Sequence, residues 1–111
     1  MSQFECIELE AAGSASVVKF KDKRVMDPAR IEMLGKELEM VAGSPQGQKL
    51  TVDFDNVKFI SSAAISKLVV LEKRIRANGG KLRLSNLRPE VRDVFSMARL
   101  DSVFDIDDLQ Q

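Results

Sequence analysis

The sequence predicts a small α/β domain on a mixed β-sheet, with a hairpin at its start, parallel strands after it and helices packed mainly on one face. Three segments carry apolar residues at helical spacing, and short segments of alternating or β-branched residues separate them. Strands joined by helices of this length pair in parallel through right-handed crossovers. The 111 residues, 44% hydrophobic and 31% charged, fit one domain over residues 1–111.

The first part of the chain predicts a β-hairpin and then a helix. Residues 4–10 and 15–21 are short apolar and β-branched segments, and residues 11–14 between them are typical of a turn. Asp27-Pro28 predicts a helix start, because Asp accepts hydrogen bonds from free amides and Pro is tolerated at the first helical position. The helix extends to about Val41 and buries an apolar stripe: Ile31, Leu34, Leu38 and Val41.

The second part of the chain predicts alternating strands and helices. Residues 49–55 alternate between apolar and polar side chains, which indicates a half-buried strand. A second helix begins at Ser61-Ser62 and stops at residues 78–80, and residues 81–85 form the next strand. Arg88-Pro89 opens a third helix that reaches Ala98, and residues 103–106 add a short final strand. The second helix buries its own apolar stripe: Ala64, Ile65, Leu68, Leu71 and Ile75.

The residue inventory excludes several kinds of chemistry. The chain has no His and one cysteine, Cys6, so it can build neither a His-based triad nor a structural zinc site. We therefore expect no enzymatic activity, no metal and no cofactor. A lone Cys favours the reducing cytoplasm, and no apolar run approaches the roughly 20 residues of a membrane helix. A net charge of zero argues against a direct nucleic-acid partner.

Two charged clusters each have a functional and a structural interpretation. Asp53 and Asp55 project from one side of their strand, where they could seat a metal or an acid/base pair, although alternation onto a solvated face explains them more simply. Between Leu71 and Arg92, seven basic and two acidic residues give a local net charge of +5. Because this stretch holds no aromatic residue for base stacking, a solvated surface or an acidic protein partner competes with nucleic-acid binding.

The turn at Ser61-Ser62 is the most informative segment. Ser61 is placed to cap the helix, which leaves Ser62 in the first turn with a hydroxyl that can face solvent. Capping explains one serine but not two. A phosphate on Ser62 would lie at the positive end of the helix, so modification could alter a binding surface without unfolding the domain.

A strip of the same helix lies beside its buried stripe. Ser62, Ser66, Val69 and Lys73 share this strip at 100° per residue. Val69 and Val70 fall outside the core arc, so they either add apolar contact area for a partner or pack partly buried.

The order of elements and several short motifs resemble the STAS domain, specifically the stand-alone bacterial anti-sigma factor antagonists. The motifs are residues 52–60, Ser61-Ser62, Gly79-Gly80 before residues 81–84, and residues 88–91 leading to Val94-Phe95. They cover nearly the whole chain. The resemblance implies a STAS-like fold and a non-enzymatic regulator of transcription.

The resemblance also implies a phosphorylation switch. In such proteins an anti-sigma factor that is also a serine kinase phosphorylates a serine at this turn; the unphosphorylated form binds that kinase and frees the sigma factor, and a serine phosphatase resets the switch. The family motif Asp-Ser-Ser/Thr-Gly places Ser62 at the phospho-acceptor, with Ser61 as the second choice. Asp27 matches the acidic residue before the first helix near the partner surface, although an N-cap is its better-supported role. The implied partner-binding residues are Asp27, Ser61, Ser62, Ser66, Val69 and Lys73.

The motif departs from the family pattern at three positions. Ser61 replaces Asp, and Ala63 and Ala64 replace Ser/Thr and Gly. These changes alter the charge and backbone freedom where a kinase would engage. They favour an alternative within the family, a scaffold or ligand-sensing module that binds partners without being phosphorylated. The oligomeric state is left open.

Overall fold

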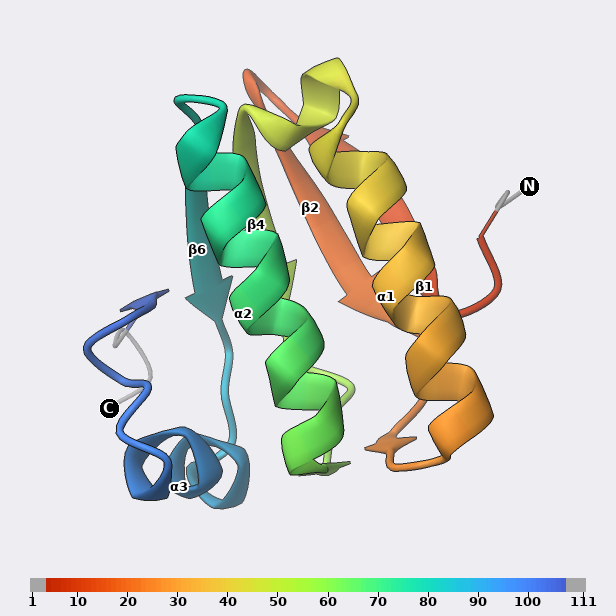
Figure 1. Cartoon of the computed structure of the whole chain (residues 1–111), viewed down its shortest axis with the longest axis vertical. Coiled ribbons are helices and arrows are strands. Elements are labelled where there is room, and N and C mark those ends of the chain that lie inside the picture. The colour runs from red at the N-terminus through yellow and green to blue at the C-terminus, as the bar shows by residue number, and fades with distance from the viewer. Residues whose placement is uncertain (1–3, 108–111) are drawn as a thin grey trace.

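The short alternating segments form a five-stranded sheet, and the two long amphipathic helices pack on one face of it (Figure 1). The computed structural model describes residues 4–107. The sheet order is β1-β2-β4-β6-β7, with β1 antiparallel to β2 and the later neighbours parallel. The strands are β1 (Ile7–Ala12), β2 (Ala15–Phe20), β4 (Lys49–Asp53), β6 (Lys81–Ser85) and β7 (Asp105–Ile106), and the helices are α1 (Pro28–Ala42), α2 (Ser62–Ala77) and α3 (Pro89–Met97). The predicted fold class is confirmed.

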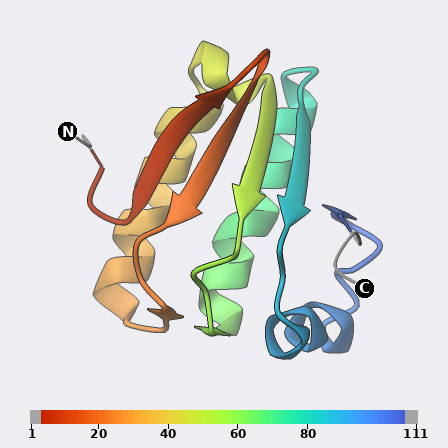
Figure 2. The same ribbon diagram turned by 180° about the vertical axis from the view of Figure 1, so that it is seen from behind.

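The two faces of the sheet differ in what covers them. Figure 1 shows α1 and α2 in front of the sheet, and the view from behind in Figure 2 shows the strands with no helix of the described residues across them. In both views α3 lies beyond the carboxyl end of β6. The expected one-sided packing therefore describes α1 and α2, while α3 closes one end. Residues 1–3 and 108–111 of the predicted domain lie outside the described residues.

The core lies between the sheet and the two long helices. Every residue of the two predicted helical stripes is buried, in one cluster with Val18, Val52 and Leu84 of the sheet. At the end closed by α3, four phenylalanine rings pack in series: Phe20 to Phe54 at 5.0 Å, Phe54 to Phe95 at 5.9 Å and Phe95 to Phe104 at 5.5 Å between centroids. These rings join the sheet to α3.

Two further strands form a separate parallel pair that the sequence patterns did not predict. They are β3 (Arg24–Val25) and β5 (Phe59–Ile60). Each has only two residues, which is too short for an alternation to be recognised. A 3-10 turn, η1 (Pro45–Gly47), also lies in the polar loop predicted after α1. Since β3 precedes α1 and β5 precedes α2, their pairing joins the starts of both helices at the lower end of Figure 1.

Several predicted boundaries were wrong. β1 extends to Ala12, so the hairpin turn narrows to Gly13-Ser14, where Gly13 takes a φ of +67° that favours glycine. β4 ends at Asp53 because its carboxylate accepts a hydrogen bond from the Asp55 amide at 2.9 Å, which turns the chain. The third helix and the last strand are slightly shorter than predicted, since α3 ends at Met97 and β7 spans Asp105–Ile106.

A buried acid explains why β1 begins at Ile7 rather than at residue 4. The Glu37 carboxylate of α1 accepts hydrogen bonds from the amides of Glu5 at 2.7 Å and Cys6 at 2.9 Å. Arg30, two turns earlier on α1, donates to the Glu5 carbonyl and pairs with Asp22 at 2.9 Å. That bond to Asp22 raises the pKa of Arg30, and burial raises the pKa of the Cys6 thiol. The segment is therefore fixed to α1 instead of pairing as a strand.

We expect Glu37→Ala to lower the free energy of unfolding by about 1–3 kcal/mol, the cost of leaving a buried amide without its acceptor. Urea unfolding measures the change. Met40→Ala, at an exposed position of the same helix, is the matched control and should stay within about 0.5 kcal/mol of the wild type. If the Glu37 variant were as stable as the control, the hydrogen bonds from the Glu5 and Cys6 amides to Glu37 would contribute nothing to stability.

Candidate functional site

The two helix starts that carry the predicted site residues lie at one end of the molecule because β3 and β5 pair in parallel. Val25 aligns with Ile60, and the Ser61 amide donates to the Val25 carbonyl at 3.1 Å. Asp27 and Ser62 each follow their strand by two residues, Asp27 as the N-cap of α1 and Ser62 as the first residue of α2. Val25 and Ile60 are buried, which anchors the pair in the core.

Both helix starts are capped by the side chains predicted to cap them. The Ser61 hydroxyl accepts a hydrogen bond from the Ala64 amide at 3.3 Å, and the Asp27 carboxylate accepts one from the Arg30 amide at 3.1 Å. Ser62 is the first residue of α2 and is exposed. The capping role thus falls to Ser61, and Ser62 lies at the positive end of the helix dipole in contact with solvent.

Substitutions at Ser61 test whether its side chain stabilises the start of α2. Ser61→Ala should lower the free energy of unfolding by about 0.5–2 kcal/mol, because an amide of the first turn loses its acceptor. Ser61→Asp should keep the stability, since Asp caps a helix as well as Ser does. Urea unfolding of both variants checks this, and equal losses in the two would show that the hydroxyl does not act as a cap.

The predicted strip of α2 is only partly a free surface. Ser66 is exposed, and its hydroxyl donates to the Ser62 carbonyl at 3.1 Å; Lys73 is exposed as well. Val69 is half-buried and packs against the core, so the packing alternative describes it. Val70 is 50% exposed and lines a groove of about 260 Å³ between α1 and α2.

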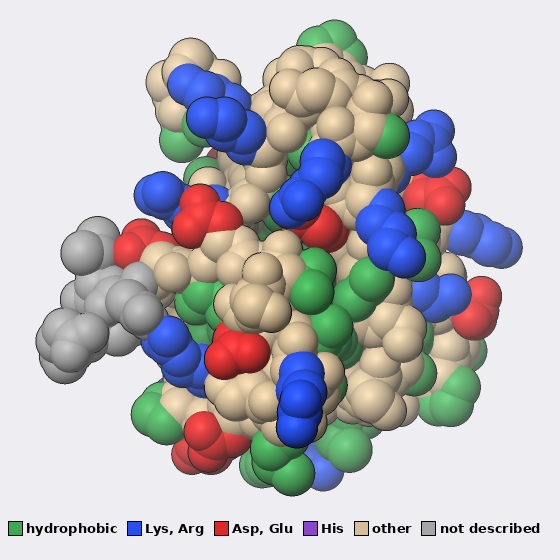
Figure 3. Space-filling model, turned by 60° about the vertical axis from the view of Figure 1, so that its left-hand side comes forward, with side chains coloured by type: hydrophobic (Ala, Val, Ile, Leu, Met, Phe, Trp, Pro, Cys, Tyr) green, Lys and Arg blue, Asp and Glu red, His purple; other side chains and the backbone are tan. Residues whose placement is uncertain are grey.

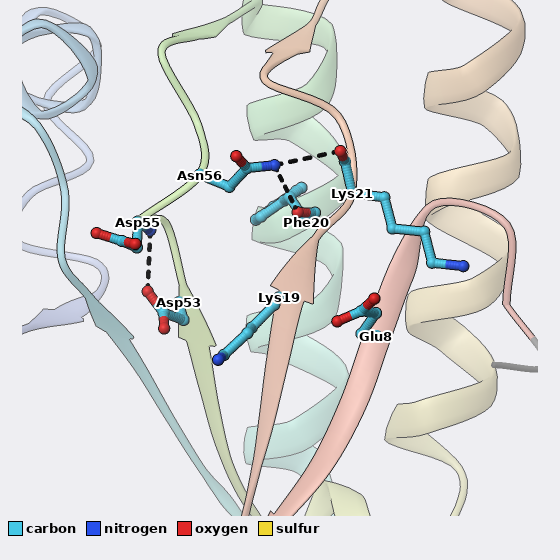
Figure 4. Close-up of a pocket in the computed structure, with 7 residues that line it drawn as sticks. All are labelled: Glu8, Lys19, Phe20, Lys21, Asp53, Asp55 and Asn56. Atoms are coloured by element: carbon cyan, nitrogen blue, oxygen red, sulfur yellow. Dashed lines mark hydrogen bonds between the residues drawn. The ribbon is translucent and has the colours of Figure 1, made fainter. Parts of the chain in front are cut away.

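Asp53 and Asp55 line a depression of about 340 Å³ on the open face of the sheet (Figure 4). The Asp53 carboxylate accepts hydrogen bonds from the Asp55 amide and from Asn86 Nδ2, the latter at 3.0 Å. Asp53 therefore ties the end of β4 to the segment after β6. Two lysines and three acids line the depression: Lys19 and Lys21, and Glu8, Asp53 and Asp55. Residues 4–107 contain no group of three or more His, Cys, Asp or Glu side chains that could hold a metal.

The basic stretch between Leu71 and Arg92 does not converge on one surface. Most of its arginines have partners in the structure: Arg74 with Glu39, Arg76 with Glu72, Arg83 with Asp105, and Arg88 with the Asp55 carbonyl. Figure 3 shows Lys and Arg side chains scattered among acidic and apolar ones. This arrangement favours the solvated-surface interpretation. Within the described range, no helix has both the length and the apolar character to span a membrane.

Sequence reasoning missed three exposed side chains on and beside the paired strands β3 and β5, which lead into the two helix starts. Phe59 and Met26 are each nearly half exposed, and the Arg24 guanidinium lies over the Phe59 ring at 4.7 Å from its centroid. The available signal was a phenylalanine two residues before the Ser-Ser turn. Its meaning depended on the pairing of β3 with β5, which no local pattern carries.

Comparison with known proteins adds a family and two solved folds. The sequence pattern of the STAS domain matches residues 7–110. The chain is 32% identical over 83 residues to the protein named "Putative anti-sigma factor antagonist BtrV" of Bordetella bronchiseptica, in an alignment that covers 74% of this chain and 70% of that protein.

The solved structures share the architecture at low sequence identity. An anti-sigma-factor antagonist (STAS) domain protein of Planctomyces limnophilus is 22% identical, with a TM-score of 0.81 over 90% of this chain and 87% of that chain. The Bacillus cell fate determinant SpoIIAA in its phosphorylated form is 16% identical, with a TM-score of 0.68 over 94% of this chain and 93% of that chain. At these identities the likeness establishes the fold.

Proposed function

The chain belongs to the STAS domain family, and on that premise we propose that it is an anti-sigma factor antagonist switched by phosphorylation of Ser62. The observation that carries the proposal is that the two serines at the start of α2 differ in their contacts. The Ser61 hydroxyl caps the helix, whereas Ser62 is exposed in the first turn. The name of the Bordetella relative supports the antagonist role, and the phosphorylated form of the Bacillus protein supports phosphate on this fold.

The chemistry is a phosphoryl transfer in which this chain is the substrate. A partner kinase moves the γ-phosphoryl group of ATP to Ser62 Oγ, and ADP and the hydroxyl proton leave. The phosphate adds a charge of about −1.5 to −2 at the N-terminus of α2, where unpaired amides and the helix dipole stabilise an anion. Because the Ser61 cap is untouched, the modification changes the surface and leaves the helix in place.

The proposed partner is an anti-sigma factor that is also the serine kinase. The unphosphorylated chain binds it and releases the sigma factor, phosphorylation ends the binding, and a serine phosphatase restores the first state. The partner contacts the chain directly at Asp27, Ser62, Ser66 and Lys73. The proposal includes no binding of nucleic acid by this chain. We place this cycle in the cytoplasm, where the buried Cys6 thiol stays reduced.

Phosphopeptide mapping tests the switch. The chain is incubated with its cognate anti-sigma kinase and Mg-ATP, and the products are analysed by mass spectrometry. We expect a single phosphate on Ser62, and none on a Ser62→Ala variant treated in parallel. An unmodified Ser62 in a reaction that phosphorylates another residue, or none, would overturn the switch and leave the antagonist role to be judged by binding.

A second candidate function is supported by the altered motif. With Ala63 and Ala64 after the switch serine, the segment lacks the hydroxyl and the glycine of the family pattern. The chain would then be a scaffold that binds its partner permanently. Equal partner affinities for the wild type and Ser62→Asp, with no phosphate found in cells, would select this function over the first.

A further inference from the structure

Phe59 is the one aromatic residue on the surface of this chain. All six phenylalanines lie among the described residues, and the sequence has no Trp or Tyr. Phe59 is 48% exposed and lies two residues before Ser61. The other five are buried: Phe4, Phe20, Phe54, Phe95 and Phe104. Aromatic residues, Phe among them, are enriched in the cores of protein interfaces relative to the rest of a protein surface.

Two neighbours extend Phe59 into a patch. Met26 follows directly after β3, the partner strand of β5, and is 47% exposed. Arg24 lies over the Phe59 ring, and its Nη2 is 4.0 Å from the Met26 sulfur. Arg24, Met26 and Phe59 are here called the anchor patch. They combine a flat ring, a flexible thioether and a planar cation, side chains well suited to filling an apolar pocket beside an acid.

The backbone beneath the anchor patch is held in place before any partner arrives. The Lys23 carbonyl accepts hydrogen bonds from the amides of Lys58 at 2.8 Å and Phe59 at 3.2 Å. Buried Val25 and Ile60 alternate with the exposed residues and fix the pair to the core. A patch that is already ordered loses little conformational entropy on binding.

Basic side chains outnumber acidic ones beside the anchor patch. Lys23, Arg24 and Lys58 are exposed on the two paired segments, and Asp27 is the exposed acid next to them. The half-buried Asp22 pairs with Arg30 at 2.9 Å. Asp and Glu on the partner surface that contacts this region therefore favour binding, and Lys and Arg there oppose it.

We propose that the anchor patch inserts Phe59 and Met26 into an apolar pocket of the anti-sigma factor, and that the rim of this pocket is acidic. The proposal rests on the proposed function and names the contact chemistry at the same end of the molecule. It also explains how phosphorylation would act: a phosphate on Ser62, three residues from Phe59, brings negative charge against the acidic rim and repels it.

Titration calorimetry with the purified anti-sigma factor tests the anchor patch. Phe59→Ala and Met26→Ala should each raise the dissociation constant. For Phe59→Ala we expect an increase of about 10- to 100-fold, as for other large anchor residues at interfaces. Arg24→Glu should raise the dissociation constant and reduce the dependence of the affinity on salt, because it replaces an attraction between unlike charges with a repulsion.

Two variants at the other end of the molecule serve as controls. Met40→Ala removes an exposed methionine near the end of α1, and Lys49→Glu reverses a charge at the start of β4; both should bind like the wild type. If the wild type binds and the Phe59 and Met26 variants match these controls, the anchor patch is overturned while the antagonist function stands. If the wild type itself does not bind, the proposed function fails, and the anchor patch fails with it.

Discussion

Replacing Phe54 with alanine is expected to lower the free energy of unfolding by about 3–5 kcal/mol, the cost of truncating a fully buried phenylalanine. Phe54 has no exposed surface and lies between the rings of Phe20 and Phe95, the latter edge-on at an interplanar angle of 88°. Truncation opens a cavity where the sheet meets α3. Small domains are stable by only about 5–15 kcal/mol, so this loss is a large fraction of the total.

Urea unfolding followed by circular dichroism measures the Phe54 effect. Phe59→Ala is the matched control, because it makes the same substitution at an exposed position, and we expect it to cost less than about 1 kcal/mol. A loss below about 1 kcal/mol for Phe54→Ala would show that the ring series does not hold α3 to the sheet.

Ser62→Asp is expected to weaken binding to the anti-sigma factor by about tenfold or more, since like charges brought together at an interface cost several kcal/mol. A carboxylate supplies a single negative charge, so its effect should be smaller than that of a phosphate, which carries about −2. Ser62→Ala should bind like the wild type and resist phosphorylation. Both variants should fold normally, because the cap belongs to Ser61.

The binding constants of these Ser62 variants are compared by titration calorimetry. Ser102→Asp adds the same charge at an exposed turn outside the predicted surface and should leave the affinity unchanged. If Ser62→Asp bound as tightly as this control, negative charge at the start of α2 would not regulate the partner.

The long elements could be predicted from the sequence because each one buries a regular stripe. α1, α2 and β6 match the predicted spans closely, since capping and periodicity are local properties. The start of β1 could not be predicted. It depends on Glu37, whose carboxylate takes the amides of Glu5 and Cys6 across 32 and 31 residues of sequence.

The candidate site divides in the same way. Ser61 and Ser62 could be recognised from sequence because an N-cap is a short-range feature. The anchor patch could not, because Arg24 and Phe59 meet only through a two-residue pairing of distant strands. The basic stretch shows the opposite error. Its residues are close in sequence, but they belong to different elements, namely α2, β6 and the start of α3.

The most direct measurement of the central claim uses one preparation of the chain in two states. The dissociation constant of its anti-sigma factor is determined for the purified chain before and after phosphorylation, with phosphate on Ser62 verified by mass spectrometry. The unphosphorylated chain should bind and the phosphorylated chain should bind at least about tenfold more weakly, as expected for a charge of about −2 at an acidic rim. Equal affinities for the two states would contradict a switch at Ser62.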